Sequence, residues 1–191
     1  DAENKNVVYE NAQARIRADI LFNVANAENA FVIGTGDLSE AALGWCTFGG
    51  DDLAHYNPNA SVPKTLVREL VRHIASVRGG DLGKVLSDIA ETSISPELVA
   101  GQETEKIVGK YELIDFIMFF FGKRHAGYSD IKNLCLAVFE ELDEDEIVET
   151  LDRFYDRFKK TRFKRSSLSE GANLLGFSLP YFPDDIDYEL I

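Results

Sequence analysis

The stretch from Gly34 to Lys64 holds the side chains with the clearest potential for chemistry. It begins with Gly34-Thr35-Gly36, directly after the short apolar run Ala30 to Ile33. The glycines allow a tight turn with exposed backbone N–H groups, and Asp37 or Ser39 can cap a helix that follows. Free N–H groups and the helix dipole attract anions at such a turn. The pattern is therefore compatible with a phosphate site.

Two charged side chains in this stretch each have two interpretations. Glu40 lies in the first turn of the expected helix, where a carboxylate complements the dipole or holds a hard metal ion beside a phosphate. Lys64 follows Pro63 at the start of another helix, for which Ser61 is a candidate cap. A cation is unfavourable at that end of a helix, so Lys64 is either tolerated at the surface or directed at an anion.

A cluster of cations lies near the carboxy terminus of a chain whose net charge is −13. Helix C-termini attract cations, which explains several of them, but their number favours phosphate binding. The overall negative charge argues against nucleic acid as a partner. The cluster consists of Arg157, Lys159, Lys160, Arg162, Lys164 and Arg165.

Helices are expected to position most of these residues. The first carries an apolar stripe of Ile16, Ile20, Val24 and Ala27, with Asn11 and Arg15 one turn apart at its edge, where they are compatible with a solvated flank. A later helix carries a similar stripe of Leu66, Leu70, Ile74 and Val77. The ranges expected to be helical are 7–26, 63–78, 82–90, 111–121, 130–142 and 145–160.

The rest of the chain is expected to be a strand and loops. Ala30 to Ile33 predicts one parallel strand, whose neighbours this chain does not obviously supply. The polar segment from Leu98 to Lys110 predicts a surface loop, and Gly176 to Ile191 an extended tail. Leu113 to Phe121 is apolar on nearly every side, which favours a subunit or domain contact slightly over a core helix.

Composition limits the class of protein. Cys46 and Cys135 are far apart, which favours a reducing, cytoplasmic setting, and three scattered histidines argue against a zinc site. No apolar run has the length of a membrane span, and no signal peptide is evident. The start at Asp1, without Met, predicts that the chain is a piece of a longer one.

Five motifs in this order resemble the synthetase domain of glutamine-dependent NAD(+) synthetase, an N-type ATP pyrophosphatase, over most of Tyr9 to Leu168. The resemblance implies an α/β fold, the C-terminal portion of a Rossmann-like adenine-nucleotide alpha-hydrolase fold, mostly helical here with few parallel strands. It divides the chain into residues 1–168 and a C-terminal tail, 169–191. The motifs are ENAQARIR from Glu10, GTGDLSE from Gly34, ALGWCTFG from Ala42, VPKTL from Val62 and FKRS from Phe163.

What the resemblance implies is an ATP-driven amidation. The nicotinate carboxylate of deamido-NAD attacks the α-phosphate of ATP, pyrophosphate leaves, and ammonia displaces AMP from the adenylated intermediate. Mg²⁺ and cations stabilise the departing phosphates. Ammonia comes from glutamine through a further upstream domain, or is used free. The substrate site of this family lies across a dimer interface, so the resemblance also implies a homo-oligomer.

The resemblance also assigns roles to residues. Thr35, Lys64 and Ser95 would contact ATP, and Glu40 would face Mg²⁺ or the nicotinate end of the substrate. The deamido-NAD site would be lined by Asn11, Arg15, Glu40, Trp45, Cys46, Thr47, Phe48, Asp52 and Lys164. No residue is assigned as catalytic with certainty.

Three departures from the family pattern restrict these expectations. The pyrophosphate loop, S-G-G-x-D-S, is absent from the 191 residues, which predicts that this chain alone has no synthetase activity. Ser169 to Asn173 departs from the usual D-G-P-K run, and Lys110 replaces a common proline. The alternatives are another amidating ATP pyrophosphatase, or a folding and dimerisation module that binds no nucleotide.

Overall fold

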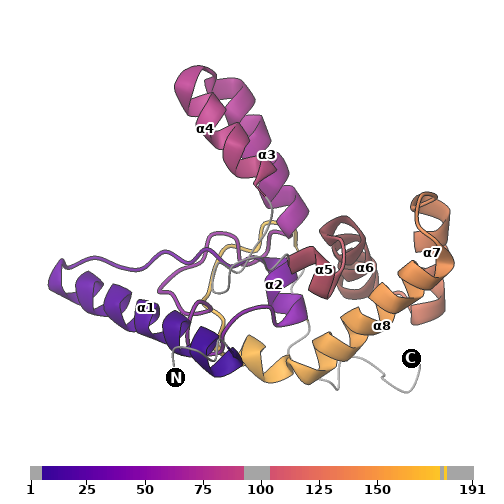
Figure 1. The fold of residues 1–191 in the computed structure, drawn as a ribbon, viewed down its shortest axis with the longest axis horizontal. Helices are drawn as coiled ribbons and strands as arrows, with labels where there is room; N and C mark the ends of the chain where they lie inside the picture. Colours follow the sequence, from indigo (N-terminus) through magenta and orange to yellow (C-terminus); the bar gives the residue numbers. More distant parts are fainter. Residues whose placement is uncertain (1–5, 93–103, 177–178, 180–191) are drawn as a thin grey trace.

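The structure is a computed structural model that describes residues 6–92, 104–176 and 179. Figure 1 shows its helices spread around a central region of loops: α1 lies on one side, α6, α7 and α8 on the other, and the hairpin of α3 and α4 projects away from both. The helices are α1 (Val7–Ala27), α2 (Leu38–Leu43), α3 (Lys64–Arg78), α4 (Gly80–Glu91), α5 (Thr104–Val108), α6 (Tyr111–Arg124), α7 (Tyr128–Val138) and α8 (Glu144–Lys160), followed by the 3₁₀ helix η1 (Arg162–Ser167).

The expected mostly helical architecture is confirmed, but the expected strand is not formed in the described part of the chain. Around Ala30 to Ile33 the only ladder contact is one parallel bridge, between Ile33 and Tyr56. A strand needs a neighbour along its length to satisfy its backbone groups, and Phe31 and Ile33 remain exposed here. The apolar run is therefore extended without belonging to a sheet.

The hydrophobic core lies where α6 packs against α2, α7 and α8. One face of α8 carries Ile147, Leu151, Phe154 and Phe158, three or four residues apart, and all four are fully buried in this core. Phe121 of α6 meets Phe154 and Phe158 in edge-on ring contacts, a favourable geometry for aromatic pairs.

Two predictions about individual segments, one apolar and one polar, are corrected by the structure. Leu113, Ile114, Ile117 and Met118 are buried inside the chain itself, so this side of α6 is a core surface and not a subunit contact. Part of the loop expected between Leu98 and Lys110 is the short helix α5, whose Thr104 and Val108, four residues apart, are buried on one side. The remainder of that loop, up to residue 103, lies outside the described residues.

The helices expected to carry apolar stripes, α1 and α3, are present, but no other described part of the chain packs over those stripes. Ile16, Ile20 and Val24 are more than half exposed, whereas the small residues Ala14, Ala18 and Ala25 face inward. The stripe of α3 is exposed in the same way, together with Leu82, Val85 and Ile89 of α4. Within the described chain, no helix has both the length and the continuous hydropathy that a membrane crossing demands.

Side-chain caps fix the first residues of three helices. Asn6 caps α1, Asp143 caps α8, and Asp37, one of the two predicted candidates, caps α2. The predicted cap Ser61 is wrong for α3: its hydroxyl donates to the Ala172 carbonyl and accepts from the Leu174 N–H. Because it is engaged with the carboxy-terminal segment, Ser61 holds residues 172–174 beside the loop that precedes α3.

Candidate functional site

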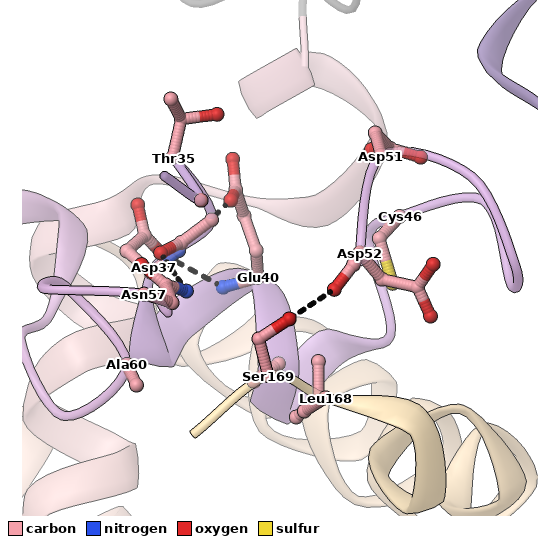
Figure 2. A pocket seen from close by; sticks show the side chains of 13 residues that line it. Thr35, Asp37, Glu40, Cys46, Asp51, Asp52, Asn57, Ala60, Leu168 and Ser169 are labelled. Atoms are coloured by element: carbon pink, nitrogen blue, oxygen red, sulfur yellow. Dashed lines mark hydrogen bonds between the residues drawn. The ribbon is translucent and has the colours of Figure 1, made fainter. Parts of the chain in front are cut away.

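A pocket of about 140 Å³ opens between the glycine turn and the loop that follows α2. Figure 2 shows Asp37, Glu40 and Asn57 on one side of it, Cys46, Asp51 and Asp52 on the other, and Leu168 and Ser169 between them. The other lining residues are Gly34, Thr35, Gly36, Ala41 and Ala60. A second, mostly apolar pocket of about 230 Å³ lies against α1 and shares Gly34, Thr35 and Asp51.

The first turn of α2 is a capping box. The Asp37 carboxylate accepts from the Glu40 N–H at 2.9 Å, and the Glu40 carboxylate accepts from the Asp37 N–H at 3.1 Å. Asn57 closes the turn before it by donating from Nδ2 to the Gly36 carbonyl at 2.8 Å. The sequence Asp-Leu-Ser-Glu therefore fixes both carboxylates at the pocket wall by local hydrogen bonding.

Lys64 lies between those carboxylates. Its Nζ is 2.6 Å from Asp37 Oδ2 and 2.7 Å from Glu40 Oε1, and 5.7 Å from the centre of the Tyr111 ring. The unfavourable position of a cation at the start of α3 is thus offset by two anions from α2. The anions that Lys64 meets in this structure belong to the chain itself.

Burial changes the proton affinity of this group. The pKa values of Asp37 and Glu40 are raised, mainly because burial penalises the charged carboxylates, although Lys64 opposes the change. Burial disfavours charged Lys64 as well, but the two carboxylates outweigh it and raise the Lys64 pKa. One ammonium shared by two carboxyls leaves an excess negative charge, so one carboxyl binds a proton more readily than a free one.

Asn11 and Arg15 hold the loop after α2. Asn11 Oδ1 accepts from the Thr47 hydroxyl at 3.0 Å, and the Arg15 guanidinium donates twice to the Phe48 carbonyl, at 3.2 and 3.1 Å. Arg15 is exposed, as expected for a solvated flank, but both side chains also contact this loop. They bring α1 to the loop that carries Thr47 and Phe48.

Asp51 and Asp52 form the opposite wall. Asp51 accepts from the Thr47 N–H at 2.6 Å, and Asp52 accepts from the Gly50 N–H at 2.9 Å and the Ser167 hydroxyl at 2.7 Å. Burial is also the main reason that the pKa of Asp51 is raised. Both carboxylates are held by the folded loop and do not depend on a ligand for their position.

The basic cluster is largely directed at backbone carbonyls. Lys164 Nζ donates to the carbonyls of Gly44 at 2.8 Å and Cys46 at 2.6 Å, and Arg157 Nε donates to that of Leu43 at 2.9 Å. These carbonyls follow the C-terminal end of α2, where cations complement the dipole. Their spacing in the sequence gave no sign of α2 as their partner, and phosphate binding by the cluster stays a prediction.

Trp45 and Cys46 are partly buried in the same loop. The Arg157 guanidinium lies 5.1 Å from the centre of the Trp45 ring, and Trp45 packs against the core. Burial, with the nearby charge of Asp51, raises the pKa of the Cys46 thiol to about 12. Since the thiolate is the reactive form, this environment disfavours a nucleophilic role for Cys46.

Most of the predicted site residues are brought together. Thr35, Glu40, Cys46 and Asp52 line the pocket, and Asn11, Arg15, Thr47, Phe48 and Lys164 support its loop. Ser95, the third predicted ATP contact, lies outside the described residues. No arrangement of three His, Cys, Asp or Glu side chains able to hold a metal ion occurs within 6–92, 104–176 and 179.

The sequence interpretation missed Asp51, Asn57, Ser169 and Asp115. Asp51 precedes the predicted Asp52, and Asp115 is the one charge within the apolar run from Leu113 to Phe121, so both had a recognisable signal. Ser169 had none. Its hydroxyl accepts from the Ala54 N–H at 2.7 Å, and an added Cβ at nearby Gly171 would overlap the Asn57 carbonyl, so the segment after η1 packs closely on the pocket loop.

Comparison with known proteins yields one family. The family model described as NAD synthase matches residues 1–167. A glutamine-dependent NAD(+) synthetase of Mycobacterium bovis is 48% identical over 121 residues, which are 59% of this chain and 18% of that protein. The enzyme of the same name from Mycobacterium leprae is 37% identical over 88% of this chain and 29% of its own length. The chain thus spans less than a third of these relatives.

Solved structures agree on the fold. A glutamine-dependent NAD(+) synthetase from Cytophaga hutchinsonii superposes with a TM-score of 0.71 at 21% identity, over 95% of this chain and 30% of that one. An NMN synthetase from Francisella tularensis gives a TM-score of 0.59 at 26% identity, over 88% and 57% of the respective chains.

Proposed function

Because this chain belongs to the NAD synthase family, we propose that it forms part of an ATP-dependent enzyme that amidates deamido-NAD to NAD. The observation that carries the proposal is the pocket on Gly34–Gly36, where an acidic helix start and Lys64 meet in a chain with five family motifs in order. The proposed fold of the complete domain is Rossmann-like, with residues 1–168 as its C-terminal portion and 169–191 as a tail.

The proposed chemistry assigns two tasks to the pocket wall. Transfer of the adenylyl group requires cations near the departing pyrophosphate, and Lys64 is a cation paired with Asp37 and Glu40, two carboxylates that line the pocket. On ligand binding, Lys64 exchanges one of its carboxylate partners for a phosphate oxygen. Thr35, exposed on the glycine turn, supplies a hydroxyl to the same ligand.

Glu40 is the proposed metal-facing carboxylate. Its donor chemistry fits Mg²⁺, which prefers oxygen ligands, and the facing Asp51 and Asp52 are also carboxylates. Both Glu40 oxygens accept hydrogen bonds here, and each carboxylate oxygen has a further lone pair. When bound, Mg²⁺ neutralises phosphate charge.

The loop held by Asn11, Arg15 and Lys164 forms the proposed deamido-NAD side of the site. Two elements, α1 and η1, hold this loop through the Phe48, Cys46 and Gly44 carbonyls and the Thr47 hydroxyl. A pre-formed loop lowers the entropic cost of ordering a ligand. The exposed apolar stripe of α1 supports a homo-oligomer, since an apolar surface of this kind marks a contact.

Glu40→Gln in the complete natural protein tests the proposal. NAD formation from deamido-NAD, ATP and ammonia is expected to fall on the order of 10- to 100-fold, because a carboxylate becomes a neutral amide at the pocket wall. Glu149→Gln makes the same change in an exposed ion pair with Arg153 and is expected to leave the rate unchanged. Product analysis by mass spectrometry follows both variants.

Three outcomes contradict the proposal. The first is unchanged NAD formation in Glu40→Gln. The second is a complete protein that amidates only a nucleotide precursor of NMN, the product named for the Francisella relative. The third is calorimetry in which neither ATP nor deamido-NAD binds, which favours a folding and oligomerisation module.

A further inference from the structure

Asp115 lies behind the pocket wall and does not line the pocket. It is 7% exposed, in the middle of the apolar helix α6, yet its carboxylate accepts hydrogen bonds from two other helices. Oδ1 accepts from the Ser39 hydroxyl of α2. Oδ2 accepts from the Thr65 N–H at 2.9 Å and the Thr65 hydroxyl at 2.7 Å, both of α3. Asp115 therefore joins three helices at one point.

The start of α3 needs these partners because it has no side-chain cap of its own. The residue at the cap position is Pro63, which makes no side-chain cap hydrogen bond. The first N–H groups of a helix lack partners within it. Here the Lys64 N–H donates to Ser39 Oγ at 2.8 Å and the Thr65 N–H donates to Asp115. A carboxylate from α6 and a hydroxyl from α2 together replace the missing cap.

The same hydrogen bonds determine where the Lys64 ammonium lies. Ser39 is flanked in α2 by the capping pair Asp37 and Glu40, and it holds the Lys64 backbone through its hydroxyl. The Lys64 side chain then returns to those two carboxylates at 2.6 and 2.7 Å. If the Ser39 hydroxyl loses its acceptor, it no longer fixes the Lys64 backbone N–H. The Lys64 ammonium is then no longer held in register with Asp37 and Glu40.

From this geometry we infer that Asp115 is a positioning residue for Lys64: it orients the Ser39 hydroxyl and caps α3, so that the ammonium is held between Asp37 and Glu40 at the pocket wall. An aspartate suits the position because three donors converge on two acceptor oxygens and no donor is required. An asparagine that keeps its oxygen toward Thr65 presents its NH₂ group to Ser39, and the serine hydroxyl loses its acceptor.

The first test measures Lys64 directly in this chain, without substrates. Amines react when unprotonated, so the two carboxylates that stabilise the Lys64 ammonium slow its acylation. Acetic anhydride labelling, read by mass spectrometry, is expected to modify Lys64 about tenfold faster in Asp115→Asn than in wild type, with exposed Lys84 as the internal reference. The matched control is Asp152→Asn, which weakens the Tyr128–Asp152 hydrogen bond between α7 and α8.

A second variant covers the case in which Asp115→Asn does not fold. Thr65→Val removes one of the three hydrogen bonds and keeps the carboxylate, so a smaller increase in Lys64 labelling is expected. Thermal unfolding confirms that each labelled sample is folded. Equal Lys64 labelling in wild type, Thr65→Val and Asp115→Asn overturns the inference.

The second test rests on the proposed function and uses the complete natural protein. Asp115→Asn is expected to raise KM for ATP and lower kcat, whereas Asp152→Asn changes neither, because only the former displaces Lys64. Faster labelling of Lys64 without any NAD formation in the wild-type protein contradicts the proposed function and leaves the positioning role supported. Unchanged labelling in a working enzyme overturns the positioning role alone.

Discussion

Four carboxyl groups at or behind the pocket wall bind protons more readily in the folded chain than free carboxyls do. Burial is the main reason that the pKa values of Asp37, Glu40, Asp51 and Asp115 are raised. Hydrogen bonds and Lys64 oppose this effect of burial without reversing it. Keeping these carboxylates ionised in the folded chain therefore lowers the free energy of unfolding. Ionisable groups at binding sites often have shifted pKa values of this kind.

These raised pKa values predict how stability depends on pH. The folded state binds more protons than the unfolded state between the unfolded pKa values of about 4 and the higher folded ones, so the free energy of unfolding falls as pH rises through that window. For a single carboxyl, a tenfold higher proton affinity in the folded state corresponds to about 1.4 kcal/mol. Urea unfolding at a series of pH values from about 4 upward measures this dependence.

Asp115→Asn isolates one of these groups. It removes a titrating carboxyl from the buried set, so its free energy of unfolding is expected to fall less steeply with pH than that of wild type. Asp152→Asn removes the same charge from α8 and serves as the control. An equal slope in Asp115→Asn and wild type contradicts the assignment of the raised pKa to Asp115.

At the scale of the element, the end of α2 is closely constrained by its neighbours. Gly44 adopts a left-handed conformation, with φ of 58°, and its carbonyl accepts from Lys164. An added Cβ at Gly44 would overlap the Thr161 side chain at the end of α8. The glycine thus permits both the turn and the contact between α2 and α8.

Gly44→Ala and Gly49→Ala separate these two roles. Both glycines have positive φ, so each variant is expected to lose about 1–2 kcal/mol from backbone strain. Only Gly44→Ala also overpacks against Thr161, which adds about 1–3 kcal/mol, because nothing lies within 4 Å of a Cβ at Gly49. Urea unfolding compares the two. Equal losses of unfolding free energy in the two variants would show that Thr161 moves aside without cost, which contradicts the predicted overpacking.

At the scale of the whole molecule, exposed apolar side chains form two longer series among the described residues. One is the stripe of α1 and the other the hairpin of α3 and α4, which projects from the rest of the chain (Figure 1). Contiguous apolar surfaces of this kind are uncommon on monomeric soluble proteins. The proposed homo-oligomer gives the stripe of α1 a partner.

Ile20→Asp tests the contact proposed for α1. Ile20 is 55% exposed at the centre of the stripe, so a charge there is expected to shift the chain toward the monomer in sedimentation velocity experiments. Val138→Asp introduces the same charge on α7 at a side chain 56% exposed, and is expected to leave the association unchanged. Association that persists in Ile20→Asp at every protein concentration contradicts a contact through this stripe.

Short-range features of the amino-acid sequence were enough to predict the family, most of the helices and the capped start of α2, but the segment Gly34–Gly36 forms no regular turn and neither glycine has a positive φ. The expected helix 145–160 corresponds to α8, and the Asp-Leu-Ser-Glu series predicted a helix start, because capping depends on residues three apart. Most of the residues that the five motifs named lie in the pocket or in contact with its loop.

How those members meet depends on the tertiary structure. Asp115 caps α3 from 50 positions away, and Lys164 reaches the end of α2 from 120 positions away; no periodicity encodes such pairs. The same holds for α6, whose apolar sides fit a core or a subunit contact equally well until the packing of α2, α7 and α8 is known. Helix capping and the periodicity of apolar residues depend on short segments of sequence. Which distant residues come into contact depends on how the whole chain packs.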